Sequence, residues 1–220
     1  MPNAIDAAFC SSKANECYIF VKQKYMVVNY APGGKKKDII TGPTNIADGF
    51  PMFANTIFKY KIDCSFDTGD NVAFFFSGDQ CAKTSYTPNS LAKARLLQGP
   101  MPIKTMFPSL KGTTFESGID AILRSHKENH VHLFKGDRRC HFNFKSNTVT
   151  GNSTISKYFP PLLGTVFEKG IDAAFNTHFE DEAFIFKDQY YLHYNIRKDV
   201  FLNGYIKLIS DDWPALRRIL

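Results

Sequence analysis

Residues 5–9 read Ile-Asp-Ala-Ala-Phe, and the same five residues return unchanged at 171–175. Two looser copies lie between them, Ile-Asp-Cys-Ser-Phe at 62–66 and Ile-Asp-Ala-Ile-Leu at 119–123. An acidic residue inside an otherwise apolar run is costly to bury. Because the chain repeats this cost four times, we expect the acid to have a purpose in every copy.

Other features recur in step with these aspartates, which stand at positions 6, 63, 120 and 172 and are separated by 57, 57 and 52 residues. Each is followed by two strand-like aromatic segments, a segment with a glycine and a short helical piece with a proline. The strand-like segments are 18–20, 74–76, 132–134 and 184–186, and then 25–30, 81–86, 140–144 and 190–194. The glycines are Gly42, Gly99, Gly151 and Gly204, and the helical pieces are 49–53, 106–110, 158–162 and 213–216.

Four copies of about 50 residues, each with three or four short strands, predict an all-β fold, a four-bladed β-propeller with a short helix at the end of each blade. The whole chain, 1–220, then forms one domain, with blades at 4–56, 57–113, 114–165 and 166–220. Four inner strands that meet at one axis leave room only for short side chains. This explains the small residues Ala7, Ala8, Cys64, Ser65, Ala121, Ala173 and Ala174.

Composition limits the class of protein. An apolar content of 44% supports a sizeable core, and a net charge of +6 is only a mild excess. No apolar run approaches the ~20 residues of a membrane span, and the first residues do not resemble a secretory signal. Lys35–Lys37 follow the turn Pro32-Gly33-Gly34 and are interpreted as a solvated hairpin tip. With the other basic residues scattered, we expect neither a nucleic-acid nor a membrane partner.

Cysteine usage indicates the compartment. Cys10, Cys17, Cys64, Cys81 and Cys140 are an odd number and contain no CxxC pair. We interpret them as free thiols of a cytosolic protein, with a Cys10–Cys17 disulfide as the alternative. The glycosylation sequon at 152–154 is then unused.

Catalysis finds no support in the sequence. It holds no HExxH, no GxSxG, no P-loop and no Rossmann fingerprint. The acids of His178-Phe179-Glu180-Asp181-Glu182 are interpreted as part of a solvated hairpin loop. We therefore expect a non-enzymatic protein.

The repeated aspartates allow two interpretations. Four equivalent oxygen groups around one axis suit a hard cation such as calcium or sodium. Alternatively, the carboxylates hydrogen-bond the neighbouring backbone. The two are compatible, since a side chain can fix a turn while a main-chain oxygen faces an ion.

The pattern resembles the hemopexin-like repeat, with the inner-strand Asp-Ala-Ala-Phe, the stretch Val131–Asp137 and the closing Phe/Trp-Pro pieces. The resemblance covers essentially the whole chain. Without a protease or a secretion signal, the chain looks like the legume seed albumin-2 group, which has stretches close to Phe-Ile-Phe-Lys at 184–187 and Phe-Glu-Ser-Gly-Ile-Asp-Ala at 115–121.

This resemblance implies cations in the central channel, calcium first, with sodium and chloride as further channel ions. Main-chain oxygens of Asp6, Asp63, Asp120 and Asp172 would form a first layer, and those of Ala8, Ser65, Ile122 and Ala174 a second. It further implies binding of haem or of a polyamine such as spermine, a homodimer that switches with ligand, and a seed storage protein with a role in oxidative stress.

Departures from the family and open alternatives complete the prediction. Blade four has no cysteine, so the disulfide that staples secreted relatives is absent and we expect the ring to close by strand packing alone. A polyamine would need a local acidic site, such as the channel mouth or a dimer interface.

The candidate haem ligands are His126, His130, His132, His141, His178 and His193, of which His130 and His132 share a strand face and could instead hold a transition metal. The alternative function is a lectin-like, glycan-binding protein or plain nutrient storage.

Overall fold

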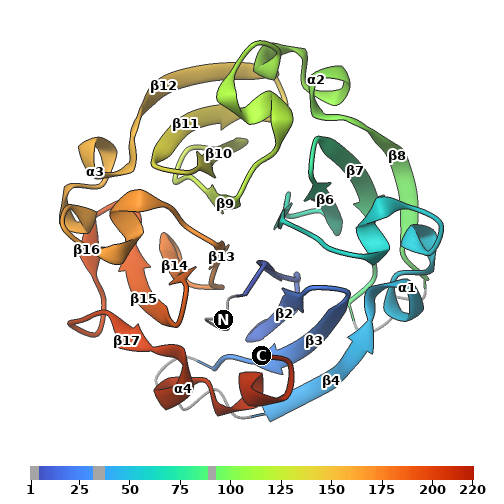
Figure 1. Cartoon of the computed structure of the whole chain (residues 1–220), viewed down its shortest axis with the longest axis horizontal. Helices are drawn as coiled ribbons and strands as arrows, with labels where there is room; N and C mark the ends of the chain where they lie inside the picture. The colour runs from blue at the N-terminus through green and yellow to red at the C-terminus, as the bar shows by residue number, and fades with distance from the viewer. Residues whose placement is uncertain (1–4, 32–37, 89–92) are drawn as a thin grey trace.

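The computed structural model describes residues 5–31, 38–88 and 93–220, and Lys35–Lys37 lie outside these ranges. Four antiparallel sheets stand around one axis, as the sequence repeat predicts (Figure 1). In three sheets the strand order equals the chain order, and the fourth has a divided outer strand. The strands of blade one are β1 (Ala7–Cys10), β2 (Glu16–Val21), β3 (Lys24–Asn29) and β4 (Asp38–Asn45). Those of blade two are β5 (Cys64–Asp67), β6 (Val72–Ser77), β7 (Gln80–Ser85) and β8 (Arg95–Pro102).

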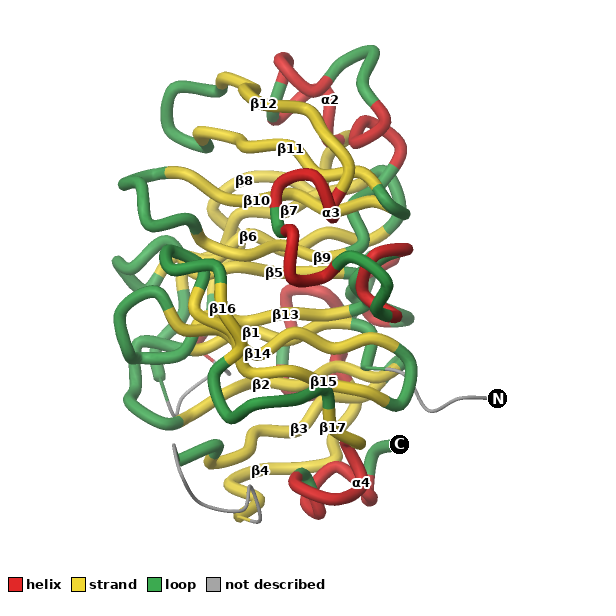
Figure 2. Tube along the Cα trace, turned by 90° about the vertical axis from the view of Figure 1, so that its left-hand side faces the viewer, coloured by secondary structure: helices red, strands yellow, loops and turns green. Residues whose placement is uncertain are grey.

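Blades three and four repeat this plan. Blade three holds β9 (Ala121–Arg124), β10 (His130–Lys135), β11 (Arg138–Asn143) and β12 (Thr148–Thr154). Blade four holds β13 (Ala173–Asn176), β14 (Glu182–Lys187), β15 (Tyr190–Asn195) and the two short pieces β16 (Val200–Phe201) and β17 (Lys207–Leu208). The helices are α1 (Ile46–Gly49), α2 (Ile103–Met106), α3 (Ile155–Tyr158) and α4 (Ile209–Asp212), each continued by a 3-10 turn that starts at a proline. Figure 2 shows most of these helices toward one face of the ring.

The inner strands β1, β5, β9 and β13 surround the axis, and each contacts the inner strands of both neighbouring blades. Each strand begins one residue after its repeated aspartate. Two faces of the ring follow from their direction. We call the face where the inner strands begin the strand-start face, and the one where they end the strand-end face.

Large side chains fill the space between blades. Successive residues of a strand point to opposite faces of its sheet. In β2, Tyr18 and Phe20 therefore pack toward Phe75 of blade two, while Cys17 and Ile19 pack toward blade four. All six residues of β2 are buried. Neighbouring blades thus cover each other, as the repeat requires.

The repeated glycines of the first two blades have a steric cause. Gly42 and Gly99 lie in the outer strands at φ +91° and +81°. A Cβ at these positions would lie 2.8 Å from the carbonyl oxygen of Tyr25 and 2.6 Å from that of Cys81. Only glycine fits such close contact with the adjacent strand.

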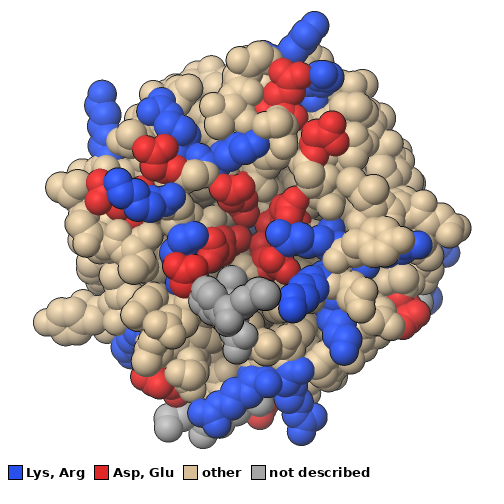
Figure 3. Space-filling model, in the orientation of Figure 1, with Lys and Arg blue, Asp and Glu red and all other residues tan. Residues whose placement is uncertain are grey.

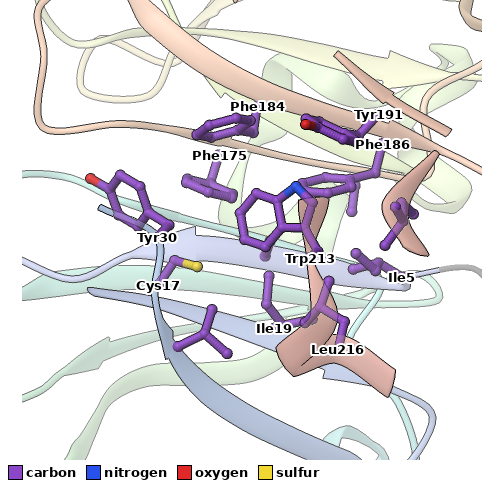
Figure 4. Packing of buried hydrophobic residues seen from close by; sticks show 14 of the residues in the cluster. Ile5, Cys17, Ile19, Tyr30, Phe175, Phe184, Phe186, Tyr191, Trp213 and Leu216 are labelled. Carbon is purple, nitrogen blue, oxygen red and sulfur yellow. The ribbon is translucent and has the colours of Figure 1, made fainter. Parts of the chain in front are cut away.

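The ring closes where blade four meets blade one. Trp213, from the closing helical piece, is fully buried and packs edge-on against Phe184 and Phe186 (Figure 4). The same cluster contains Ile5 and Ile19 of blade one. No disulfide joins these blades, since all five cysteines are free. Packing is not their only link, however, because hydrogen bonds to His178 also join blades one and four.

All five cysteines are free thiols. Cys10 and Cys17 face each other across β1 and β2 without a disulfide. Among the helices described, none is long and apolar enough to span a membrane.

Candidate functional site: the central channel and its cavity

The four repeated aspartates fasten turns at the strand-start face. Each carboxylate accepts a hydrogen bond from the first backbone N–H of the tight turn between the second and third strands of its own blade. The donors are Lys22 for Asp6, Gly78 for Asp63 (2.6 Å), Gly136 for Asp120 (2.7 Å) and Asp188 for Asp172 (2.7 Å). The turn residues all have φ between +51° and +55°. The interpretation that these carboxylates bond neighbouring backbone is therefore confirmed.

Lysines partly neutralise this end of the channel. Lys61 Nζ lies 3.3 Å from Asp6 and 2.9 Å from Asp63, joining blades one and two. Lys187 Nζ lies 2.6 Å from Asp172. Burial alone would lower the pKa of Lys61, but the two carboxylates raise it overall. Figure 3 shows acidic and basic side chains intermixed around the middle of this face.

The second predicted layer lies deeper along the channel. Ala8, Ser65, Ile122 and Ala174 are all nearly inaccessible to bulk solvent. All four form part of the wall of one large cavity, which opens on the strand-end face. Because they are its deepest inner-strand residues, they form its floor. Three are apolar, and the fourth, Ser65, has a hydroxyl without a hydrogen-bond partner among the described residues.

The cavity has a volume of about 880 Å³ and is lined by all four blades. The last residues of the inner strands, Cys10, Asp67, Arg124 and Asn176, surround it above the floor. The side-chain amide of Asn176 links blade four to blade three. It accepts a hydrogen bond from Arg124 N at 2.7 Å and donates one to Arg124 O at 3.1 Å. The inner strands thus run from the aspartates at the strand-start face to this cavity at the strand-end face.

The wall of the cavity is acidic, whereas the protein as a whole has a net positive charge. The carboxylates are Asp67, Asp70, Glu128, Glu180 and Asp181, and the Lys and Arg side chains are Arg124, Lys127 and Lys145. The wall therefore carries more acidic than basic groups although the chain has a net charge of +6. Burial raises the pKa of Asp67, and hydrogen bonds from Tyr86 and Gly69 oppose that increase.

The donor set of the channel fits a hard cation. In the described part of the chain, no three His, Cys, Asp or Glu side chains converge to hold a metal. The aspartate carboxylates are already bonded, so main-chain oxygens are the ligands that remain. The buried hydroxyl of Ser65 is one further oxygen at this level, and oxygen ligands suit calcium or sodium rather than a softer metal.

The six histidines divide into two groups. His126, His130 and His178 line the cavity. Of the other three, His193 bonds Glu182 at 3.0 Å, and His132 accepts from the buried Arg139. Burial, followed by Arg139, lowers the pKa of His132 well below its ordinary value and that of His141 to about 4. The alternative that His130 and His132 hold a transition metal finds no support, since Arg139 occupies Nδ1 of His132 and no third His, Cys, Asp or Glu converges with the pair in the described part of the chain.

His178 is the residue whose role the sequence did not reveal. Its ring accepts a hydrogen bond at Nδ1 from Asn15 N (3.1 Å), and Nδ1 also bonds the Tyr30 hydroxyl. Its Nε2 lies 3.2 Å from the carbonyl oxygen of Ser11. The loop expected to be solvated thus ties blade four to blade one. No motif marks this role, since the partners are more than 140 residues away.

Comparison with known proteins shows which class of protein this ring belongs to. The hemopexin family model matches residues 171–218, and the four-bladed ring is of this type. Albumin-2 from Lathyrus sativus is 42% identical over 100% of this chain and 98% of its own length. A plant albumin from Cicer arietinum showing hemagglutination has 43% identity and a TM-score of 0.94, with 98% of each chain covered. A plant lectin from Cicer arietinum with two metal binding sites has 44% identity and a TM-score of 0.93, again with 98% of each chain covered.

The chain belongs to the albumin-2 family of legume seed proteins, which confirms the resemblance seen in the sequence. These relatives are named as albumins or lectins, and none of the names denotes an enzyme.

Proposed function

We propose that this seed albumin is a non-enzymatic binding protein whose strand-end cavity takes a linear polyamine such as spermine. The observation that carries the proposal is the excess of carboxylates over Lys and Arg in the cavity wall of a basic protein. A polycation is repelled by the protein as a whole, and this cavity offers the local acidic site that it needs.

The acidic groups are placed for an extended ligand. Asp67 and Asp70 belong to blade two, and Glu180 and Asp181 to blade four, across the ring. Arg197 lies within 4 Å of both blade-four acids and partly neutralises them. Arg124 lies beside Asp67, so an arginine faces the acids of each wall. Asp70 is exposed at the rim of blade two.

Calorimetric titration with spermine tests the proposal. Asp70→Asn should weaken binding about threefold, since removing one exposed charge at the rim of a watery site changes the binding energy only modestly. Lys127→Gln should strengthen binding. Asp137→Asn, an exposed acid on the turn after β10, is the matched control and should leave binding unchanged. Equal affinities for all four proteins would refute the assignment to this cavity.

A resident channel cation is part of the same proposal. Main-chain oxygens of Asp6, Asp63, Asp120 and Asp172, followed by those of Ala8, Ser65, Ile122 and Ala174, would hold calcium, with sodium and chloride as further ions. The oxygen-only donor set supports this. When bound, the cation would neutralise converging carbonyl dipoles and so stabilise the four inner strands against each other.

Haem is the second candidate ligand, favoured by the histidines at the cavity rim. His126 is exposed there, and no side-chain hydrogen bond to it is formed by the described residues. Its imidazole is thus available to iron. Haemin titration followed by Soret absorbance, repeated with spermine present, tests whether the two ligands exclude each other. Loss of the Soret change in His126→Ala would support this ligand, and would fit the proposed role in oxidative stress.

The remaining proposals concern assembly and location. We propose a homodimer that dissociates or forms with ligand, and size-exclusion chromatography with and without spermine tests it. The five free thiols support a cytosolic location. Glycan binding is the alternative function, supported by the related albumin that shows hemagglutination. A glycan array and an erythrocyte assay would separate it from plain storage.

A further inference from the structure

The charges in the cavity wall are sorted by blade. Blades two and four contribute carboxylates and no Lys or Arg, and the wall residues of blade one carry no charge. Among the described residues, blade three contributes all the Lys and Arg side chains of the wall, which are Arg124, Lys127 and Lys145. Its one carboxylate there, Glu128, accepts a hydrogen bond from the Asn129 amide. Arg124, Lys127 and Lys145 therefore form a basic wall in an otherwise acidic cavity.

The side chain of Arg124 extends from blade three into the cavity. Its Nη1 lies 3.5 Å from the main-chain oxygen of Asp67 in blade two. A Cβ added to Gly69, which also lines the cavity, would lie 3.9 Å from the same nitrogen. Arg124 acts on blade one as well, since it opposes the rise that burial causes in the pKa of Cys10. The exposed guanidinium thus faces the space that the blades enclose.

The position of this guanidinium is fixed from behind. The side chain of Asn176 holds both the N–H and the carbonyl group of Arg124. The carboxylate of Asp67 does not compete for the guanidinium, because it accepts hydrogen bonds from Tyr86 and from Gly69 N. Arg124 contacts the main-chain oxygen of Asp67 instead. Its N–H groups are therefore held in the cavity without being used by a neighbouring acid.

The cations of the basic wall are short of partners. A guanidinium has five N–H donors. The described residues accept from one of them, through the long bond to Asp67. Lys127 and Lys145 form neither an ion pair nor a side-chain hydrogen bond within the described ranges. The lysines of the strand-start face, in contrast, lie within 3.3 Å of their carboxylates. The basic wall thus offers donors and positive charge to a ligand.

We propose that Arg124 and Lys127 form an anion subsite in the strand-end cavity, which binds the carboxylate or phosphate group of a multivalent oxyanion. Arg124 supplies a planar fork of N–H donors that matches two oxygens of such a group, and Lys127 adds a point charge at the rim. The subsite goes beyond the proposed polyamine site, because it uses the opposite charge on a different blade and does not require a polyamine to bind.

Calorimetric titration with inorganic phosphate and with succinate, at constant ionic strength, tests the subsite. The anion that binds more tightly identifies the group as phosphate or carboxylate. Arg124→Gln should weaken its binding about tenfold, because charge-assisted hydrogen bonds are lost. Lys127→Gln should weaken it about threefold through the lost charge. Lys157→Gln is the matched control, since it removes the same charge from an exposed lysine of α3 outside the cavity wall, and it should bind as wild type does.

Spermine gives a second readout on the same variant. Arg124→Gln should weaken phosphate or succinate binding but strengthen spermine binding, because it removes a positive charge from the cavity that a polycation enters. A substitution that only disturbed the cavity would weaken both kinds of ligand. In NMR spectra of the arginine Nε–H groups, the signal that Arg124→Gln removes should be the one that shifts most when the anion is added.

Two results would overturn the inference. Equal anion affinity in wild type, Arg124→Gln and Lys157→Gln would show that a basic protein attracts anions without a subsite. Absence of both phosphate and succinate binding to wild type would also refute it, while leaving the polyamine proposal intact. Conversely, anion binding that depends on Arg124 in a protein that does not bind spermine would support the subsite and refute the polyamine proposal.

Discussion

The contact between blade four and blade one provides the sharpest test of how this ring is closed. His178→Ala removes an imidazole that bonds Asn15 N, the Tyr30 hydroxyl and the Ser11 carbonyl and stacks on the Tyr30 ring at 5.7 Å. Asn15 N and the Tyr30 hydroxyl share the one lone pair of Nδ1, so we count two hydrogen bonds at about 1 kcal/mol net each and the stacked pair at ~0.5–1 kcal/mol. Together these contributions predict that His178→Ala lowers the free energy of unfolding by about 3 kcal/mol.

Urea denaturation followed by tryptophan fluorescence is the assay, since the single tryptophan, Trp213, is buried in the same inter-blade core. His178→Phe keeps the stacking and should lose only the hydrogen-bond part. A double-mutant cycle with Tyr30→Phe isolates the pair, whose coupling should exceed 0.5 kcal/mol for residues in direct contact. His126→Ala, exposed on the same face, is the control. If His178→Ala unfolds within about 0.5 kcal/mol of wild type, the blades are closed by packing alone and our reasoning fails.

Three further outcomes are expected. Asp120→Ala should lower the free energy of unfolding by about 1–2 kcal/mol, because the Gly136 N–H loses its acceptor. Asp137→Ala on the same turn is the control. Equal losses for the two variants in urea melts would contradict the role of Asp120 as the acceptor for this turn. The free energy of unfolding should fall as the pH drops from 6.5 to 4. The reason is that burial and Arg139 lower the pKa of His141 from 6.5 to about 4, so only the unfolded state takes up the proton in that range, and above pH 6.5 neither state does. His141→Gln should reduce this slope, measured by urea melts at several pH values. Finally, calcium at about 100 times its dissociation constant should raise the melting temperature of chelator-treated protein by roughly 5–10 °C, and an unchanged melting curve would argue against a channel cation.

Local chemistry repeated at a fixed period made the fold predictable. The Phe/Trp-Pro pieces and the aromatic segments recur once per blade and correspond to closing helices and paired strands. The repeated glycines lie in the outer strands of the first three blades, and Gly204 lies in the bend that divides the outer strand of blade four. Even the role of Asp120 as a backbone acceptor could be anticipated, because its partner Gly136 is only 16 residues away. The site was less accessible to prediction. The cavity combines wall residues from four blades, and His178 meets Tyr30 across 148 positions, so no local pattern contains either.

Symmetry explains why the departures between blades are more informative than the repeat itself. A ring of four identical inner strands would present four identical positions around the axis, which suits a spherical ion but gives an elongated ligand no orientation. This chain replaces those equivalent positions with unlike groups: a serine at one floor position, then a thiol, a carboxylate, a guanidinium and an amide at the ends of the inner strands. Selection for packing alone has no need of a buried, unpaired hydroxyl at Ser65, nor of Arg124 beside Asp67. Unlike groups at equivalent positions are what a cavity needs to hold an asymmetric ligand in one direction, and this cavity has them on the side of the ring away from the aspartates.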